Sequence, residues 1–146
     1  GMKAITLYQP WGSAIAAMLK RYETRSWPVW KYWRDWRGST MAIHAGKSRQ
    51  SLDELPIDVE LSLLIETAQA EGKLPEVFPL GCVLCTVKVV NCIQMDAPFI
   101  LKQTAQERTL GDWRVGRYAW EMEVTEVFAK PIPARGEQGL WDWYAA

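Results

Sequence analysis

Apolar and polar positions alternate along several segments of the chain, as expected for strands that bury one face. The segments are residues 4–8, 22–27, 40–45, 81–93 and 140–144, and the run after Gly116 in which Tyr118, Trp120, Met122 and Val124 are apolar. Pro131 and Pro133 are expected to end that run, because proline cannot donate to a sheet. The sequence therefore predicts about six strands.

A helical period follows the first predicted strand. Trp11, Ala14, Ile15, Met18 and Leu19 recur at intervals of three and four residues, which places them on one face of a helix. Pro10 suits the first helical position, where its missing N–H costs nothing. Lys20 and Arg21 are expected to end the helix, because cations are favourable at the negative end of its dipole.

Residues 48–79 are predicted to form a helical excursion. Pro56 marks a helix start, Gly72 suits its C-terminal end, and Ile57, Leu61, Leu64, Ile65 and Ala68 form the expected buried stripe. Its outer face carries Asp58, Glu60, Glu66 and Glu71, so we expect it to lie away from any phosphate-binding surface. A shorter helical turn is expected over residues 104–107.

Strands separated by helical excursions of varied length predict a mixed α+β fold built around a small barrel. With 146 residues, the chain fits a single domain over residues 2–146, with Gly1 interpreted as an expression remnant. No run of about 18 apolar residues is present, so no membrane contact is predicted. The start of the chain lacks a secretory signal pattern, and three cysteines fit a reducing compartment, so the predicted location is cytoplasmic.

The formal net charge is zero, yet the charges are divided unevenly along the chain. Residues 1–50 carry nine Lys/Arg and two acidic residues, which leaves the remaining residues with an equal acidic excess. This asymmetry suggests an electropositive surface, unless folding interleaves the two halves.

The segment Lys20 to Trp27 concentrates candidate chemistry in eight residues. If residues 22–27 form a strand, Glu23, Arg25 and Trp27 share one face, and Lys20 at the helix end leans over it. A carboxylate, a guanidinium and a flat ring together suit a planar hydrogen-bonding ligand such as a nucleobase. The alternative is a surface ion pair that contributes little.

A second segment places Trp27, Trp30, Trp33 and Trp36 at every third position, with Tyr32, Lys31, Arg34 and Arg37 between them. Cations that follow phosphates and rings that stack on bases are typical of single-stranded nucleic acid binding. In the alternative interpretation, at least two of the four tryptophans lean on the core. The spacing also fits a short irregular helix.

His44 is the only histidine, and its position beside Ile43 is more typical of a core or rim residue than of a metal ligand. Lys47 follows Gly46 and could reach a phosphate, although the glycine spacing is not that of a P-loop. Cys82 and Cys85 would point to opposite faces of a strand, and no second pair completes a zinc site. The three cysteines are therefore interpreted as core residues, and neither a metal nor a cofactor is predicted.

In order along the chain, these segments resemble a known family. Residues 6–11, the helix and the pattern Lys20-x-x-Glu23-x-Arg25 are similar to the opening of an ASCH domain, a member of the PUA-like superfamily. The family signature is Gly-x-Lys-x-x-Glu-x-Arg, and here Met18 stands at the glycine position, where it is expected to alter the turn or crowd the pocket floor. Later segments at residues 38–47, 111–121 and 135–141 extend the resemblance over nearly the whole chain outside the helical excursion.

The resemblance implies a PUA-like small β-barrel with flanking helices, a helical insertion around residues 48–79, and a cleft beside the first helix that binds RNA or a modified nucleobase. In that cleft Glu23 would accept from an exocyclic amine. Arg25 and Lys20 would donate to carbonyl or phosphate oxygens, while Trp27 or Trp11 stacks on the base. The candidate binding residues are Pro10, Trp11, Lys20, Glu23, Arg25, Trp27, Arg34, Arg37, His44 and Lys47.

Whether the protein is an enzyme stays open at this point. Some small ASCH members are amidohydrolases acting on N4-acetylcytidine, with a lysine at the position of Lys20 and a threonine at the position of Glu23. That threonine is absent here, and Thr24 is expected to point to the opposite face. Lys20 and Glu23 would then be the catalytic residues, with Glu23 as general base for water.

Two further alternatives remain. Other family members have been linked to RNA cleavage, for which His44 would serve as general acid only if it faces the cleft. A different class is a protein-interaction module that uses the tryptophan segment as an exposed apolar patch. The sequence makes no prediction of oligomeric state.

Overall fold

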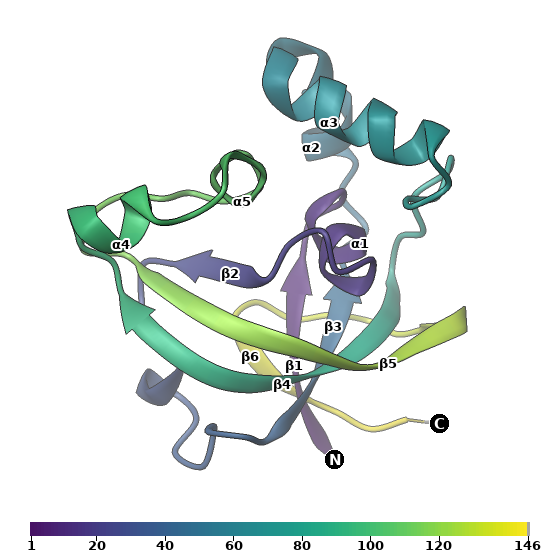
Figure 1. Ribbon diagram of the computed structural model, residues 1–146. Helices are drawn as coiled ribbons and strands as arrows, with labels where there is room; N and C mark the ends of the chain where they lie inside the picture. The colour runs from purple at the N-terminus through teal and green to yellow at the C-terminus, as the bar shows by residue number, and fades with distance from the viewer. Residues whose placement is uncertain (146) are drawn as a thin grey trace.

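The computed structural model describes residues 1–145, which form one six-stranded mixed sheet with short helices around it (Figure 1). The strands are β1 (Met2–Leu7), β2 (Tyr22–Arg25), β3 (Thr40–Ala45), β4 (Cys82–Gln94), β5 (Tyr118–Pro133) and β6 (Leu140–Trp143). The helices are α1 (Trp11–Ala16), α2 (Gln50–Asp53), α3 (Val59–Ala70), α4 (Ala97–Leu101) and α5 (Ala105–Thr109), with 3-10 turns η1 (Val29–Lys31) and η2 (Leu55–Ile57). The α+β class expected from the sequence is confirmed.

The strands are ordered β2-β5-β4-β3-β1-β6, and the only parallel pair in this sheet is β1 with β3. The two long strands β4 and β5 pair along most of their length and shift register three times, between Val83 and Cys85, Thr86 and Val87, and Val89 and Asn91. Such irregularities bend and twist a strand pair. Figure 1 shows the result, a strongly curved sheet that wraps around α1.

The curved sheet is not closed into a barrel, because β2 and β6 are both edge strands. The outer edge of β2 is occupied by side chains: the N–H groups of Tyr22 and Thr24 donate to the carboxylates of Glu107 and Glu23. Backbone groups with side-chain partners are not free to pair with another strand. Across the opening, the Arg25 guanidinium donates to the carbonyl oxygen of Thr6 at 3.4 Å.

Two apolar clusters meet at α1. The main core lies against the sheet and includes Ile15 of α1, whereas Ala14 belongs to a second cluster. The second cluster joins α1 to the helical insertion and to the loop after α5; its buried members are Ala14, Leu61, Ile65, Ala68, Leu74, Phe78 and Leu110. The insertion is therefore packed on a core of its own beside the sheet.

Helix α1 is shorter than predicted, and Lys20 and Arg21 lie beyond it. Met18 adopts a left-handed backbone with φ of 60° and is 75% exposed, so it neither continues the helix nor crowds a pocket floor. Both Leu19 N–H and Lys20 N–H then return to the carbonyl oxygen of Ala14, which closes the turn. Lys20 is consequently buried beyond the helix, whereas the sequence predicted that it would end the helix.

Pro10 precedes α1 as its N-cap residue instead of occupying the first turn. The buried side chain of Gln9 supplies the missing cap, because its Oε1 accepts from the N–H of Ser13 at 2.9 Å. Its Nε2 donates to the Ser13 hydroxyl and to the carbonyl oxygen of Pro79. This residue therefore anchors α1 to the segment that leads into β4.

The insertion differs from the prediction at its start. Pro56 lies in η2, Ile57 is exposed, and α3 begins only at Val59, where Asp58 caps it by accepting from the N–H of Leu61. Asp58 can cap and Ile57 cannot, because a cap needs a side-chain acceptor. Burial of Leu61, Ile65 and Ala68 is confirmed, as is the end of the helix near the left-handed Gly72. Helix α4 was not predicted, whereas a helical turn is present at α5.

The tryptophan segment is partly core, as the alternative interpretation predicted. Trp36 is buried, and Trp27 and Trp33 are half-buried against the main core. Trp30 remains 48% exposed, and Tyr32 is 60% exposed. The expected short irregular helix is present as η1.

The three cysteines are free and buried, which confirms them as core residues. Burial raises the pKa of each thiol, that of Cys85 to about 12. No helix within residues 1–145 is long and apolar enough to cross a membrane. Within the same residues, no three His, Cys, Asp or Glu side chains gather as ligands for a metal ion.

Candidate functional site

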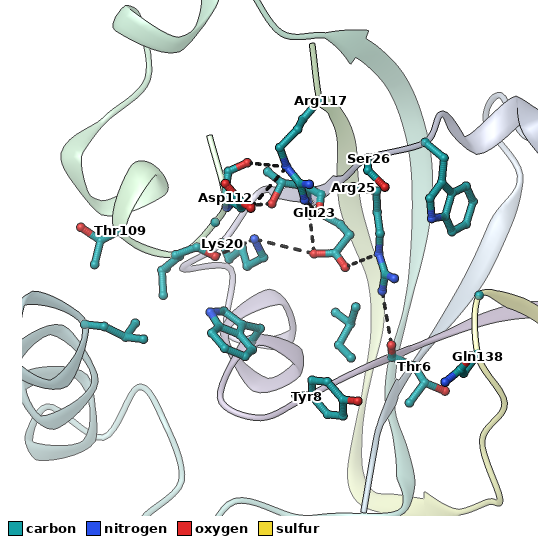
Figure 2. Close-up of a pocket in the computed structure, with 18 of the residues that line it drawn as sticks. Thr6, Tyr8, Lys20, Glu23, Arg25, Ser26, Thr109, Asp112, Arg117 and Gln138 are labelled. Atoms are coloured by element: carbon teal, nitrogen blue, oxygen red, sulfur yellow. Dashed lines mark hydrogen bonds and ion pairs between the residues drawn. The ribbon is translucent and has the colours of Figure 1, made fainter. Parts of the chain in front are cut away.

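A cleft of about 750 Å³ opens beside α1, at the gap between β2 and the end of β1. Its lining comes from separate parts of the chain, namely residues 6–8, 11, 20, 23–27, 58, 61, 109–112, 117 and 137–139. Figure 2 shows side chains from β1, β2, the loop after α5 and the loop before β6 directed toward a common space.

The floor of the cleft holds a chain of charged groups (Figure 2). Lys20 Nζ lies 3.8 Å from Glu23 Oε1, and Arg25 Nε donates to Glu23 Oε2 at 3.0 Å. The side chains of Lys20 and Glu23 are only 1% and 8% exposed. Glu23 therefore presents a largely desolvated carboxylate with a cation on either side.

A backbone carbonyl group also holds the side chain of Lys20 in place. Its Nζ donates to the carbonyl oxygen of Leu110 at 2.7 Å. Burial lowers the pKa of Lys20, while the carboxylates of Glu23 and Glu107 act in the opposite sense and raise it. Burying an ammonium group is costly unless it is paired. Such groups are frequent at binding and catalytic sites.

The loop after α5 is tied to β2 around Thr24. The Thr24 hydroxyl accepts from the N–H of Asp112 at 2.9 Å, and Arg117 donates both to the Asp112 carbonyl oxygen and to that of Thr24. At Gly111 an added Cβ would lie 2.8 Å from the indole nitrogen of Trp113, so only glycine fits this close approach. Hydrogen bonding to Arg114 is the main cause that lowers the pKa of Asp112.

Glu107 of α5 fixes the start of β2. Its two carboxylate oxygens accept from the N–H groups of Arg21 and Tyr22, each at 3.0 Å. The side chain is buried, and its own carbonyl oxygen accepts from the indole of Trp113 at 2.8 Å. The carboxylate thereby fixes the backbone directly after Lys20, whose side chain lies in the floor of the cleft.

The walls of the cleft include several apolar and aromatic side chains, namely Tyr8, Trp11, Trp27, Leu61 and Leu110. Trp27 stacks edge to face on Trp120 of the core, with ring centroids 5.0 Å apart. The Arg25 guanidinium lies 5.9 Å from the centroid of the Trp27 ring. A polar floor with apolar walls is typical of small-molecule sites.

Of the residues singled out from the sequence, the cleft brings together Trp11, Lys20, Glu23, Arg25 and Trp27. Five others lie outside it, and one of them, His44, is buried in the core. Pro10 is buried at the start of α1, and Arg34 and Arg37 are exposed in the segment after η1. Lys47 is exposed at the end of β3, where its aliphatic chain lies close to Gly81.

His44 is a core residue and does not line the cleft, so the structure does not support it as a general acid for RNA cleavage. Its Nε2 lies 2.7 Å from the carbonyl oxygen of Ala134 and must carry the proton, which leaves Nδ1 to accept from the Thr6 hydroxyl. Thr6 Oγ1 in turn accepts from the indole of Trp141 at 3.0 Å. Burial lowers the pKa of His44, while the hydrogen bond to Ala134 raises it.

Sequence reasoning missed several lining residues. Asp58 was expected on an outer face away from the site, yet its capping position at the start of α3 places it at the cleft. Leu110 carried no local signal, and residues 137–139 were noted only within a segment that is similar to the family. Gly111 and Asp112, with Arg117, were noted only as similar to a family segment.

A scan against protein-family models and a search of curated proteins found no match to this chain. The family resemblance therefore remains a prediction from the motifs.

Proposed function

We propose that the cleft binds a nucleobase, either in a free nucleoside or within RNA. The observation that carries this proposal is the Glu23 carboxylate, desolvated on the cleft floor between Lys20 and Arg25. A carboxylate is the group that pairs with the exocyclic amine of cytosine. Donors next to it suit the ring nitrogen and carbonyl oxygen beside that amine, and the aromatic walls suit the faces of the ring.

The burial of this charged set argues against a surface ion pair. Exposed pairs form at little cost and contribute little, whereas burying Lys20 and Glu23 requires removing water from both. Buried charges with such a desolvation cost are found most often where they take part in binding or catalysis. Arg25 remains partly exposed, so it can turn from Thr6 toward a bound molecule.

We also propose that the chain is an ASCH-type member of the PUA-like superfamily. The convergence of Lys20, Glu23 and Arg25 in a cleft beside the first helix supports this, as does the backbone of Met18. Its φ of 60° is a conformation that favours glycine, the residue of the family signature at this position. In this proposal the barrel has an open seam between the edge strands β2 and β6, and the free, buried cysteines support a cytoplasmic location.

A second candidate is an amide hydrolase acting on an acylated nucleoside, and the lowered pKa of Lys20 beside Glu23 favours it. In that candidate Glu23 takes a proton from the water that attacks the amide carbon, and Lys20 stabilises the charge that develops on the amide oxygen. The proton held by Glu23 then passes to the amine as the carbon–nitrogen bond breaks. Thr24 is a poor nucleophile here, because its hydroxyl already accepts from Asp112.

A panel of nucleosides and acylated nucleosides tests both candidates by calorimetry and chromatography. We expect at least one nucleoside to bind, and Glu23→Gln to weaken that binding at least tenfold, about 1.4 kcal/mol, since it removes one oriented acceptor. Glu121→Gln is the matched control, because Glu121 pairs with the exposed side chain of Arg21 outside the cleft. Unchanged binding by Glu23→Gln, or no binding by any nucleoside, would refute the proposal. Product formation that Lys20→Ala abolishes would establish the hydrolase.

A further inference from the structure

An exposed surface of rings and cations continues from the wall of the cleft. It consists of Trp30, Lys31, Tyr32, Arg34 and Arg37, and is called here the aromatic–basic face. We propose that a single-stranded nucleic acid runs across this face with one of its bases in the cleft. The proposal rests on the proposed function of the cleft and extends it from a base to a strand.

One exposed ring of this face adjoins the wall of the cleft, and a second is held by the core in the same segment of the chain. Trp27 lines the cleft, and the Tyr32 ring lies 5.2 Å from it in an edge-to-face contact. The Trp30 ring packs edge to face against Tyr118, with ring centroids 5.7 Å apart, and against the buried Trp36, with centroids 6.2 Å apart. Rings that are exposed yet held by the core are suited to stacking successive bases without a sequence requirement.

Cations lie between these rings. Lys31 Nζ is 5.4 Å from the centroid of Tyr32, and the Arg37 guanidinium is 4.6 Å from that of Trp36. Arg34 is exposed in the same segment. Within residues 1–145 none of these three cations forms an ion pair, and Asp35 is the only acidic residue between residues 28 and 39. The face therefore has cationic groups available for phosphates.

The distribution of charge around the cleft also indicates on which side the nucleic acid leaves it. The insertion carries Asp53, Glu54, Asp58, Glu60, Glu66, Glu71 and Glu76 against Arg49 and Lys73. Figure 1 shows α3 at the top of the molecule, whereas the segment that follows β2 lies at the lower left. Phosphates are repelled on the side of α3 and attracted on the side of Tyr32. The strand therefore leaves the cleft past Trp27.

This combination favours a nucleic acid over a protein partner. Aromatic residues and arginine are also frequent at protein interfaces, but the cores of those interfaces are otherwise depleted of charge, whereas this face interleaves a cation with nearly every ring. Single-stranded nucleic acids offer both a π-face and a negative charge at each step. The exposed rings and the unpaired cations are then used by the same molecule.

The test compares a mononucleotide with a tetranucleotide of the base that binds in the cleft, by calorimetry, in RNA and in DNA form. We expect the tetranucleotide to bind at least tenfold tighter. Trp30→Ala/Tyr32→Ala should remove this gain and leave mononucleotide binding unchanged, while Trp30→Phe/Tyr32→Phe should keep most of it. Tyr144→Ala, an exposed ring on the other edge of the sheet, is the matched control.

Salt dependence gives an independent measurement. Each phosphate contact with a single strand contributes a slope of about −0.7 to log K against log salt. Lys31→Ala/Arg34→Ala should therefore make the slope for the tetranucleotide shallower by about 1.4, whereas the exposed Lys130→Ala should not. A length gain in RNA, in DNA or in both supports the proposal, and the preferred sugar identifies the polymer.

Failure of this proposal is distinguishable from failure of the proposed function. A tetranucleotide that binds no tighter than the mononucleotide, or that binds Trp30→Ala/Tyr32→Ala as tightly as wild type, would refute the strand path and leave the base site intact. Tetranucleotide binding that Glu23→Gln does not weaken would refute the path through the cleft, because no base would then occupy the cleft. Absence of binding by either molecule would refute both.

Discussion

The carboxylate of Glu107 is expected to stabilise the fold more than any exposed ion pair of the protein. It accepts the N–H groups of Arg21 and Tyr22, each at 3.0 Å, in a buried position. Glu107→Gln keeps the shape of the side chain but replaces one acceptor oxygen with an NH₂ group. One backbone N–H then faces another donor and loses its partner.

The expected cost follows from these two bonds. A hydrogen bond to a charged group contributes about 1.5–3 kcal/mol, and an unsatisfied buried donor costs about 1–3 kcal/mol. We therefore expect Glu107→Gln to lower the free energy of unfolding by about 2–4 kcal/mol. The change also removes a charge that raises the pKa of Lys20, so it makes the buried ammonium less favourable in the folded state.

Urea unfolding of wild type, Glu107→Gln and Glu121→Gln measures this cost. Glu121 pairs with the side chain of Arg21, which is exposed, so the control should lose less than about 1 kcal/mol. Hydrogen exchange should accelerate at the amides of Arg21 and Tyr22 in Glu107→Gln. A loss of stability no larger than that of the control, with unchanged exchange at these amides, would refute the reasoning.

Two further predictions concern Met18 and His44. Met18→Gly should raise the free energy of unfolding, measured in urea, by about 0.5–1 kcal/mol. The reason is that relief of the left-handed conformation of a non-glycine residue, about 1–2 kcal/mol, exceeds the chain-entropy cost of glycine. A lower urea midpoint would contradict this. His44 has a lowered pKa, so the unfolded chain binds more protons below its ordinary value of about 6.5. Stability should therefore be full above that pH and fall as pH decreases from it toward the folded pKa. Because His44 is the only histidine, NMR should show one imidazole titration, and a midpoint at or above 6.5 would contradict the prediction.

Features that depend on local patterns could be predicted from the sequence. The alternation of apolar residues located β1, β3, β4 and β6 to within one or two residues, because burial of a sheet face imposes a period of two. The cluster from Lys20 to Trp27 indicated which side chains would approach one another, since they are neighbours in the chain. The turn and cap residues Gly72 and Thr104 also marked helix ends, although Thr104 was read only as part of a turn.

Features that depend on distant partners could not be predicted. The apolar period continues to Leu19, yet α1 ends earlier because Met18 turns left-handed to bring Lys20 into the cleft. Glu107 looked like an ordinary helix residue, and its role requires partners 85 and 86 residues away. For the same reason the sequence did not reveal that the outer edge of β2 would be occupied by side chains and leave the predicted barrel open.

The central position of β1 in its half of the sheet has a consequence for folding. β1 pairs on one side with β3 and on the other with β6. Both edges of β1 are therefore covered only after residues 140–143 have been synthesised and have paired with it. Contacts of such long sequence separation slow folding. During synthesis on the ribosome, β1 therefore has an exposed edge until residues 140–143 have emerged. Residues 137–139 at the rim of the cleft emerge after the other lining residues, so we expect the nascent chain to complete its binding site only once they have left the ribosome.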